Sequence, residues 1–552
     1  MSLGNEFLKN ALQEKYKNLT VPATHSVHLD SDKPESLEDV FVEVHLQKHH
    51  TASIPEKLSL SDLKERETQV QTSDAIPLGQ LFCSLGGDSH KTNIATKVLL
   101  QGRPGVGKST LVKYAANQWA KGSIWEDTKY TFLVSLKELQ LPPNESLSLS
   151  QLLFDGLIPL KHHAACLDVI TKHPQELLVI LDGYDERRCL DKQQEQNKNE
   201  AALATLLSHI INNEVLPGAK VLVSSRPSKQ LPVKAFNQTV QLCGFSKEMI
   251  NEYVCKMYTK EQKDFIMKHL DADRNMAGLC QVPLQCTFVC AGLADRLSCG
   301  DDDAGMAVVN TTTGLYVQAT IQMARKLHPQ LKDSKEETDL DELFDTIEAP
   351  LVKHAELAKY GIMSSPPKFL FYKDDLDKFQ FDKSDRDCGF LVESSTLDPR
   401  MRGTRRHCWQ FTHTTIQEFF GTVGMLRSGD NVWMSLPKED MPEHLKTMVS
   451  FLAGLLGDPN HRYYVERLVA GGAALDTGKL AATLEDMLMT TRIFTEMMND
   501  DAMIIATVYE TQNSDMVDIV PTEIASRYLS VMDIHALVWL LENENFHVTS
   551  LK

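Results

Sequence analysis

The chain is poor in basic residues relative to acidic ones. Its 552 residues include 57 Lys and Arg against 75 Asp and Glu, which gives a formal net charge of −18. Nucleic acids and anionic membranes are negatively charged, so proteins that bind them present a basic surface. The shortage of basic residues therefore argues against a nucleic-acid partner.

Long hydrophobic runs are also missing, and the cysteines do not follow a disulfide framework. Apolar runs such as residues 451–456 fall far short of the roughly 20 residues that cross a bilayer. Residues 1–12 lack the apolar centre of a secretory signal. The 11 cysteines are an odd number spread over a long chain, which is typical of reduced cytosolic thiols. We therefore expect a cytoplasmic protein without a membrane span.

The histidines and cysteines that lie close together in sequence do not have the spacing of zinc ligands. His162, His163 and Cys166 have no second pair that would complete a four-ligand site. We therefore expect no metal at this position. Three further cysteines fall in an apolar helical stretch and are expected to be core thiols: Cys280, Cys286 and Cys290.

What is present is an ordinary globular composition with an ordered pattern from about residue 96. Hydrophobic residues make up 42% of the chain, and at about 150 residues per domain the length predicts three to four domains. Aliphatic runs without polar alternation, separated by helical windows, predict a parallel α/β sheet whose strands are covered on both faces. The expected strands are residues 98–100, 132–134, 177–181 and 221–223.

Elsewhere the pattern is mainly helical. Residues 7–16 have apolar positions at helical spacing, and residues 41–46 alternate as a short strand. After Pro227 the strand pattern fades, so the chain is expected to be mostly α overall. The expected helices there are residues 245–300, 312–365, 413–427 and 442–470, and the segment from 470 to 552.

The strongest chemical motif is the segment of residues 102–110, which has the form G-x-x-x-x-G-K-[ST] between an expected strand and an expected helix. Its glycines allow successive N–H groups to turn inward around phosphate oxygens at a helix N-terminus. Lys108 would reach the β- and γ-phosphates, and the Ser109 hydroxyl would bind Mg²⁺. The predicted nucleotide-binding residues are Gly102, Arg103, Pro104, Gly105, Val106, Gly107, Lys108, Ser109 and Thr110.

Two of the expected strands end in charged residues. One leads into Asp182, which would lie beside the Mg²⁺ of bound ATP. Asp185 and Glu186 follow, and they would polarise a water for attack on the γ-phosphate. Another strand leads into Arg226. A planar cation there would contact ATP and ADP differently and so sense the γ-phosphate; the alternative is a capping or surface arginine.

Together these three motifs resemble the NACHT nucleotide-binding domain of NOD-like receptors, which are STAND P-loop NTPases. Residues 281–284 are similar to the family's Pro-Leu turn, whose proline packs near the adenine. Residues 411–420 are similar to its Phe-x-His-x-x-x-Gln-Glu-Phe element, whose histidine contacts the ADP β-phosphate. The resemblance implies nucleotide-binding roles for Pro283 and His413.

The resemblance also implies an order of domains. No death-fold effector domain is apparent, and the residues left at the end are too few to form a repeat array, so the chain is expected to lack these parts or to be a fragment. The implied order is a pre-NACHT segment 1–93, a NACHT domain 94–230, a first helical domain 231–308, a winged-helix domain 309–427, a second helical domain 428–525, and the start of a leucine-rich repeat region 526–552.

The function implied by the resemblance is an ATP/ADP-dependent, Mg²⁺-assisted conformational switch of innate-immune, inflammasome-like signalling. ADP would lock a closed state, and ATP would drive oligomerisation with itself, with other NOD-like receptors or with signalling adaptors. Hydrolysis would be slow and would reset the switch. One alternative is a regulatory scaffold or decoy that co-assembles with full receptors. Another is a turnover ATPase or kinase, although no substrate lid is evident in the sequence.

Overall fold

The computed structural model describes most of the chain up to residue 470 and short pieces after it. The described residues are 2–19, 36–48, 75–83, 96–139, 147–186, 200–227, 232–299, 311–327, 340–365, 367–397, 405–428, 442–470, 509–510, 523–524, 536–537 and 550–551. Among them, no helix is both long enough and apolar enough to cross a membrane. The helices expected after residue 470 lie almost entirely outside the described residues.

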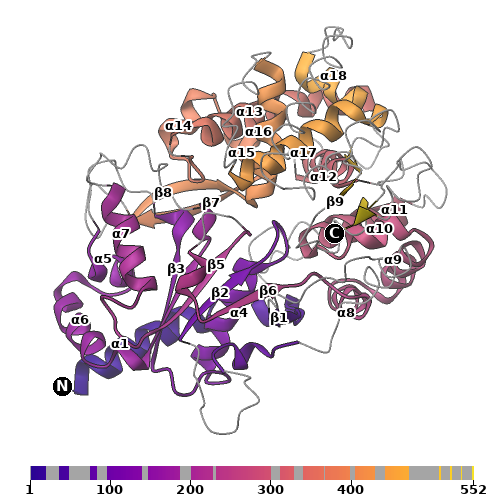
Figure 1. Ribbon diagram of the computed structural model, residues 1–552. Helices are drawn as coiled ribbons and strands as arrows, with labels where there is room; N and C mark the ends of the chain where they lie inside the picture. The colour runs from indigo at the N-terminus through magenta and orange to yellow at the C-terminus, as the bar shows by residue number, and fades with distance from the viewer. Residues whose placement is uncertain are drawn as a thin grey trace.

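A six-stranded sheet forms the centre of the first half of the chain (Figure 1), and its strand order is β1-β6-β2-β5-β4-β3. Five neighbouring strands run parallel, and β1 pairs antiparallel with β6 at one edge. The strands are β1 (Leu46–Lys48), β2 (Lys97–Gln101), β3 (Tyr130–Ser135), β4 (Leu177–Asp182), β5 (Lys220–Ser225) and β6 (Gln238–Leu242).

The predicted parallel sheet and its four expected strands are confirmed. Every residue of β4 and of β5 is buried, which explains why these strands read as unbroken aliphatic runs. The helices beside the sheet include α1 (Ser2–Lys17), which confirms the helix expected over residues 7–16. Tyr16 of α1 accepts a hydrogen bond from Leu133 N of β3, at 2.9 Å. The other helices here are α4 (Lys108–Lys121), α5 (Leu149–Phe154), α6 (His163–Lys172) and α7 (Glu200–Ile211).

Two expectations about strands are wrong. The strand expected over residues 41–46 begins only at Leu46, because its partner β6 ends at Leu242, which pairs with Leu46. Cys243 N still donates to His45 O, at 3.0 Å, but the chain before that point has passed the end of the sheet. Strands also continue after Pro227, in β6 and in the antiparallel pair β7 (Leu391–Leu397) and β8 (Arg405–Phe411).

Four helices follow the sheet and pack at its side, as the sequence predicts for residues 245–300. Ser246 and Thr259 cap α8 and α9 through hydrogen bonds from the backbone N–H groups of Met249 and Gln262, which fixes where these helices start. A short turn separates α10 from α11. The helices are α8 (Lys247–Met257), α9 (Lys260–Ala272), α10 (Arg274–Leu279) and α11 (Pro283–Cys299).

Three of the remaining helices surround α16, which is buried from Thr415 to Met425. A helix that is buried on all sides belongs in the centre of a bundle, and α13, α17 and α18 pack against it (Figure 1). Short helices at 373–378 and 383–386 were not predicted. The elements are α12 (Thr312–Leu327), α13 (Leu340–Met363), α14 (Lys373–Lys378), α15 (Lys383–Arg386), α16 (Thr414–Ser428), α17 (Glu443–Gly457) and α18 (Arg462–Ala470).

The N-terminus of α12 is capped by a residue that is distant in sequence. Glu510 is 5% exposed, and its carboxylate accepts hydrogen bonds from Thr312 N at 3.1 Å and Thr313 N at 2.8 Å. The Thr313 hydroxyl also donates to it, at 2.6 Å. Two of the N–H groups that a helix start leaves unpaired are thus satisfied by one carboxylate.

Candidate functional site

The phosphate-binding motif forms a tight loop between β2 and α4. Gly102 N donates to Ser225 O at 3.2 Å, which holds the start of the loop against the end of β5. Gly105 and Gly107 have φ angles of +75° and +96°, in the left-handed region that other residues adopt only at a cost. The loop shape therefore depends on glycine at these two positions, as the motif predicts.

Lys108 lies folded back over this loop. Its Nζ donates to Gly102 O at 2.7 Å and to Arg103 O at 2.8 Å. Burial lowers the pKa of Lys108 to about 8, although nearby Asp185 favours the charged form. The ammonium group therefore stays mostly protonated at neutral pH and is held by two carbonyl oxygens of the loop.

The acid at the end of β4 is held in place by its neighbour strand. Asp182 is 5% exposed, and its Oδ1 accepts a hydrogen bond from Ser224 Oγ at 2.5 Å. Ser224 Oγ in turn accepts from Gly183 N, at 2.9 Å. Ser109 is exposed at the second position of α4. A carboxylate and a hydroxyl are oxygen donors of the kind that Mg²⁺ takes, so the donor chemistry fits the predicted ion.

The two acids that follow differ in their surroundings. Asp185 accepts hydrogen bonds from Arg226 N at 2.9 Å and from Ser225 Oγ at 3.3 Å, and its other oxygen lies 3.2 Å from Arg226 Nε. Burial raises the pKa of Glu186 above its ordinary value. Glu186 is therefore the better proton acceptor of the pair, while both oxygens of Asp185 are already engaged.

Arg226 connects the end of the sheet to α16. The side chain is 4% exposed, which excludes the alternative of a surface arginine. Its Nη1 pairs with Glu418 Oε1 at 2.7 Å, and its Nη2 donates to Thr414 Oγ1 at 3.2 Å. The Arg226 guanidinium therefore bridges two carboxylates, Asp185 after β4 and Glu418 on α16.

Burial dominates the charge balance of this contact. Glu418 is only 1% exposed, and burial raises its pKa to about 7, although Arg226 opposes the shift. The pKa of Arg226 is raised by Glu418 and Asp185 despite its burial. Glu418 is therefore close to taking up a proton at neutral pH, although it is paired with Arg226.

His413 caps the start of α16. Its Nδ1 accepts a hydrogen bond from Thr415 N at 3.1 Å and lies 2.9 Å from Thr415 Oγ1. Burial, with additional repulsion from Lys137, Arg226 and Lys108, lowers the pKa of His413 to about 3. The ring is therefore neutral at pH 7, and because Nδ1 accepts, its single proton lies on Nε2. A neutral donor of this kind suits a phosphate oxygen.

Pro283 is the first residue of α11 and belongs to a turn that touches the phosphate loop. Leu284 N donates to Gly105 O at 3.2 Å. A Cβ atom at Gly105 would lie only 3.1 Å from Val282 Cγ1. The structure therefore places the predicted proline turn directly against the predicted loop.

The sequence interpretation missed several residues that the fold brings to this site. Ser224 orients Asp182, Thr415 orients His413, and Thr414 and Glu418 hold Arg226. A signal for Glu418 was available, because a glutamate inside an apolar helical run is rarely buried without a partner. The partner itself is 192 positions away in sequence (418 − 226), so no local pattern identifies it.

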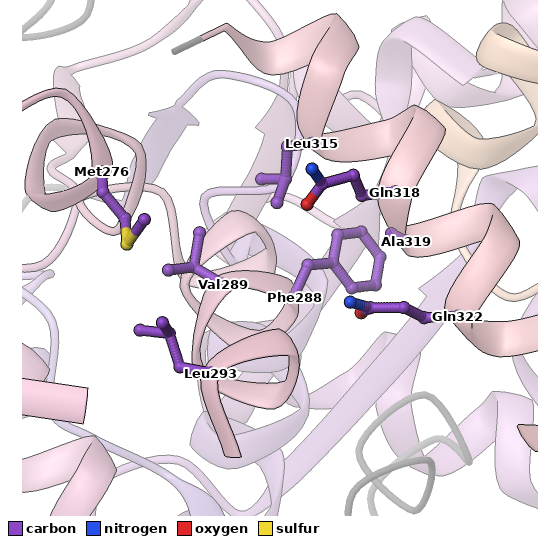
Figure 2. Close-up of a pocket in the computed structure, with 8 residues that line it drawn as sticks. All are labelled: Met276, Phe288, Val289, Leu293, Leu315, Gln318, Ala319 and Gln322. Carbon is purple, nitrogen blue, oxygen red and sulfur yellow. The ribbon is translucent and has the colours of Figure 1, made fainter. Parts of the chain in front are cut away.

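A separate small cavity lies between α11 and α12 (Figure 2). Its volume is ≈ 10 Å³, room for one water at most. The side chains around it are mainly apolar, among them Phe288, Leu293 and Leu315. They offer no cationic ligand for a phosphate, so this cavity does not belong to the candidate site.

Comparisons with known proteins agree with this geometry. The NACHT domain model matches residues 96–261. The chain is 27% identical over 393 residues to human NACHT, LRR and PYD domains-containing protein 14, covering 65% of this chain and 33% of that protein. It is 25% identical over 476 residues to human NACHT, LRR and PYD domains-containing protein 3, covering 78% of this chain and 42% of that protein. The chain thus spans less than half the length of these relatives.

Among solved structures, Cdc6p from Pyrobaculum aerophilum matches with a TM-score of 0.24 and 10% identity, covering 66% of this chain and 92% of that chain. A likeness this low carries no argument about the fold. The α/β class rests instead on the parallel sheet, the glycine loop before α4 and the helices on the sheet's flanks. The match over residues 96–261 identifies a NACHT domain in this chain, and the relatives to which the chain is similar are NACHT, LRR and PYD domains-containing proteins.

Proposed function

We propose that this chain is the nucleotide-dependent switch of a NOD-like receptor: closed with ADP, opened by ATP, and oligomeric when open. The observation that carries the proposal is the position of Arg226. It follows the last residue of β5 in the nucleotide-binding sheet, and its Nη1 pairs at 2.7 Å with the carboxylate of Glu418 on α16. A residue able to sense the γ-phosphate therefore also holds the two parts together.

The phosphate loop and its neighbours bind the nucleotide in this proposal. The loop residues 102–110 and Lys108 contact the phosphates, and the turn at Pro283 packs beside the base. Ser109 and Asp182 would hold Mg²⁺, which neutralises phosphate charge when bound. Nε2–H of His413 donates to the terminal phosphate of ADP, so one ring caps α16 and holds the nucleotide.

Opening follows from competition for Arg226. A γ-phosphate is a stronger partner than a carboxylate that is already close to protonation, so Arg226 transfers to it. Glu418 then loses its cation and takes up a proton, so the attraction between Arg226 and α16 is lost. Departure of α16 from the sheet follows, and the faces so exposed serve oligomerisation.

Hydrolysis would return the switch to the closed state. Glu186 acts as the proton acceptor for the attacking water, because burial raises its pKa, while Asp185 positions Arg226. This assignment refines the sequence interpretation, in which both acids shared the role. The bounds given above for the NACHT, helical and winged-helix domains are part of the same proposal, as are a cytoplasmic location and partners among other receptors and signalling adaptors.

The test is the nucleotide content and assembly state of the purified chain. We expect near-stoichiometric ADP in the denatured wild type and less than a tenth of that amount in Lys108→Ala. Lys121→Ala is the matched control, since Lys121 lies on the same helix and pairs with Glu38 instead. Exchange into a slowly hydrolysed ATP analogue should shift the chain from monomer to oligomer by light scattering. An empty wild type with rapid steady ATP turnover would instead indicate a working ATPase.

A further inference from the structure

Three cysteine side chains converge in the helical part that follows the sheet. The sulfur atoms of Cys280, Cys286 and Cys290 all lie within 4.8 Å of one another. All three residues are fully buried. Sequence analysis predicted buried core thiols here, and that is confirmed, but their convergence on one point was not predicted because the spacing is unlike that of known zinc motifs.

The local fold produces this convergence. Cys286 and Cys290 are four residues apart on α11, so their side chains lie on one face of the helix, one turn apart. Cys280 comes from the other side of a sharp turn, just after α10, and its N–H donates to Met276 O at 3.2 Å. The turn folds the end of α10 back onto the first turns of α11. Cys280, which follows α10, thus joins the two cysteines on α11 as the third member of the cluster.

The distances are those of ligands that share one ion. With metal–sulfur bonds of about 2.3 Å, two sulfurs on one ion lie roughly 3.8 Å apart at a tetrahedral angle and about 4.0 Å apart at a trigonal one. Cys286 Sγ and Cys290 Sγ are 3.8 Å apart. Two thiols in ordinary contact lie about as close, so this pair alone does not indicate a metal site. The third sulfur, within 4.8 Å of the other two, is what indicates one.

The donor set selects the class of metal. Within the described residues, the three cysteines are joined by no histidine or carboxylate, so sulfur is the sole donor type that the side chains supply. Thiolate donors favour the soft ions Zn²⁺ and Cu⁺ over Mg²⁺, Ca²⁺ or Mn²⁺, which prefer oxygen. A trigonal set of three sulfurs in a dry core suits Cu⁺ as it stands, whereas Zn²⁺ would require a fourth donor.

The position of the cluster connects it to the candidate nucleotide site. The residues between its first two members, 281–285, comprise the end of the turn and the first residues of α11, and they include Val282 and Leu284. Leu284 N donates to Gly105 O at 3.2 Å, and Val282 lies where a side chain at Gly105 would be. On its other side, Gln281 O accepts from Phe245 N at 2.7 Å. An ion bound by the cysteines would hold both ends of the segment that supports the phosphate loop.

We propose that Cys280, Cys286 and Cys290 form a binding site for one thiophilic metal ion, Zn²⁺ or Cu⁺, which fixes the segment 281–285 against the phosphate loop. The proposal of the metal site does not depend on the proposed switch. The effect of the ion on nucleotide release rests on the proposed function, and the experiment separates the two.

The first experiment measures metal alone. The full chain, reduced and stripped of metal under anaerobic conditions, is titrated with Co²⁺ as a spectroscopic substitute for Zn²⁺ and, separately, with Cu⁺ against a competing chelator. We expect one equivalent of at least one ion per chain, with sulfur-to-cobalt charge-transfer bands in the Co²⁺ arm if Zn²⁺ is the natural ion. Failure of the folded wild type to bind either ion at one equivalent would overturn the site, and this result needs no variant.

Variants assign the ligands. Cys286→Ala with Cys290→Ala should reduce bound metal to less than a tenth of an equivalent. Cys166→Ala, which removes a buried thiol beside the sheet, and Cys255→Ala, which removes an exposed thiol on α8, should leave it unchanged. Circular dichroism of each variant checks its folding. Equal metal binding by a folded double variant would contradict the assignment.

The last measurement tests the connection to the phosphate loop. Removal of the ion from wild type by a chelator should increase the rate of ADP release several-fold, and the double variant should show no such response. Metal binding without any bound nucleotide would leave the metal site standing and overturn the proposed switch. Metal binding with an unchanged ADP release rate would leave the site standing and overturn its support of the loop.

Discussion

Among the described residues, two contacts between the nucleotide-binding sheet and later helices differ in their chemistry. Toward α11 the contact is made of backbone hydrogen bonds and apolar packing, such as Leu284 N to Gly105 O and Phe245 N to Gln281 O. Toward α16 it is made of a buried charge bridge, in which Arg226 joins Asp185 to Glu418. The two contacts flank the same phosphate loop.

This difference indicates which contact a nucleotide can release. A phosphate group can accept from a backbone N–H group, but it cannot donate to Gly105 O or replace the packing of Val282. It does compete directly for a guanidinium, because both phosphate and carboxylate accept from the same N–H fork. The α11 contact is therefore expected to stay closed in every nucleotide state, while the α16 contact changes.

The largest expected effect comes from removing the bridging cation. Arg226→Ala leaves Asp185 and Glu418 buried without their partner, and we expect it to lower the free energy of unfolding by about 3–5 kcal/mol. Chemical denaturation would measure this. Adding Glu418→Gln should recover part of the loss, because it removes one of the unpaired charges.

Arg406→Ala is the control for that experiment. Arg406 pairs with Asp374, whose side chain is 77% exposed, and pairs of this kind contribute about 0–1 kcal/mol. A loss as small for Arg226→Ala as for Arg406→Ala would mean that the α16 contact does not depend on its charge bridge.

The next effect concerns pH at the same contact. Folded Glu418 holds a proton up to about pH 7, whereas an unfolded glutamate loses it near 4.3. Between these values the folded chain binds more protons, so this residue's contribution to the free energy of unfolding falls as pH rises. Relative to Glu418→Gln, the wild type should gain up to about 1.4 kcal/mol per unit as pH falls from 7 to 5.

Unfolding midpoints in urea across that range would show the difference. Glu356→Gln, on the partly exposed face of α13, is the matched control for replacing a glutamate by glutamine. A pH-independent gap between wild type and Glu418→Gln would contradict the assignment of the raised pKa to Glu418.

A smaller effect tests the α11 contact. Gly105→Ala places a side chain at a φ of +75°, 3.1 Å from Val282 Cγ1. Gly122→Ala meets the same kind of strain at +80° with no atom within 4 Å. Left-handed strain alone costs about 1–2 kcal/mol, so both should be destabilised by that amount and Gly105→Ala by more. Equal unfolding midpoints would show that Val282 moves away freely.

The smallest effect on stability separates the two roles of His413. His413→Ala removes the cap of α16 and should cost about 1 kcal/mol. His413→Asn keeps a capping oxygen and should cost less. If Nε2–H also holds the nucleotide, both variants should release bound ADP faster than wild type in a chase with excess ATP. Unchanged release in both variants would restrict the role of His413 to the cap.

The sequence predicts the largely buried strands better than the strands that carry polar residues. Strands β2 to β5, including β3 at one edge of the sheet, are largely buried and read as aliphatic runs, so they were predicted, whereas β6 was missed although it lies inside the sheet. β6 carries Gln238, Thr239 and Gln241 among its five residues, and β8 begins with two arginines. Such strands exist because neighbours supply their hydrogen bonds, and that information lies in the tertiary structure rather than in the local pattern.

The candidate site divides in the same way. The phosphate loop is local, since its glycines, Lys108 and the start of α4 follow one another in sequence. The residues that orient the predicted groups, such as Ser224 beside Asp182 and Glu418 beside Arg226, act across strands or across long separations. The sequence therefore predicts the residues expected to contact the nucleotide and the metal, but not the residues that orient them.

The cap of α12 by Glu510 has a consequence for the order in which the chain folds. Thr313 and Glu510 are separated by 197 positions, and ribosomes add roughly 5–20 residues per second. For about 10–40 s after α12 leaves the ribosome, its first amides therefore lack their carboxylate. During synthesis, this region is expected to depend on chaperones or on delayed docking, while the sheet, whose strands are complete by Leu242, assembles first.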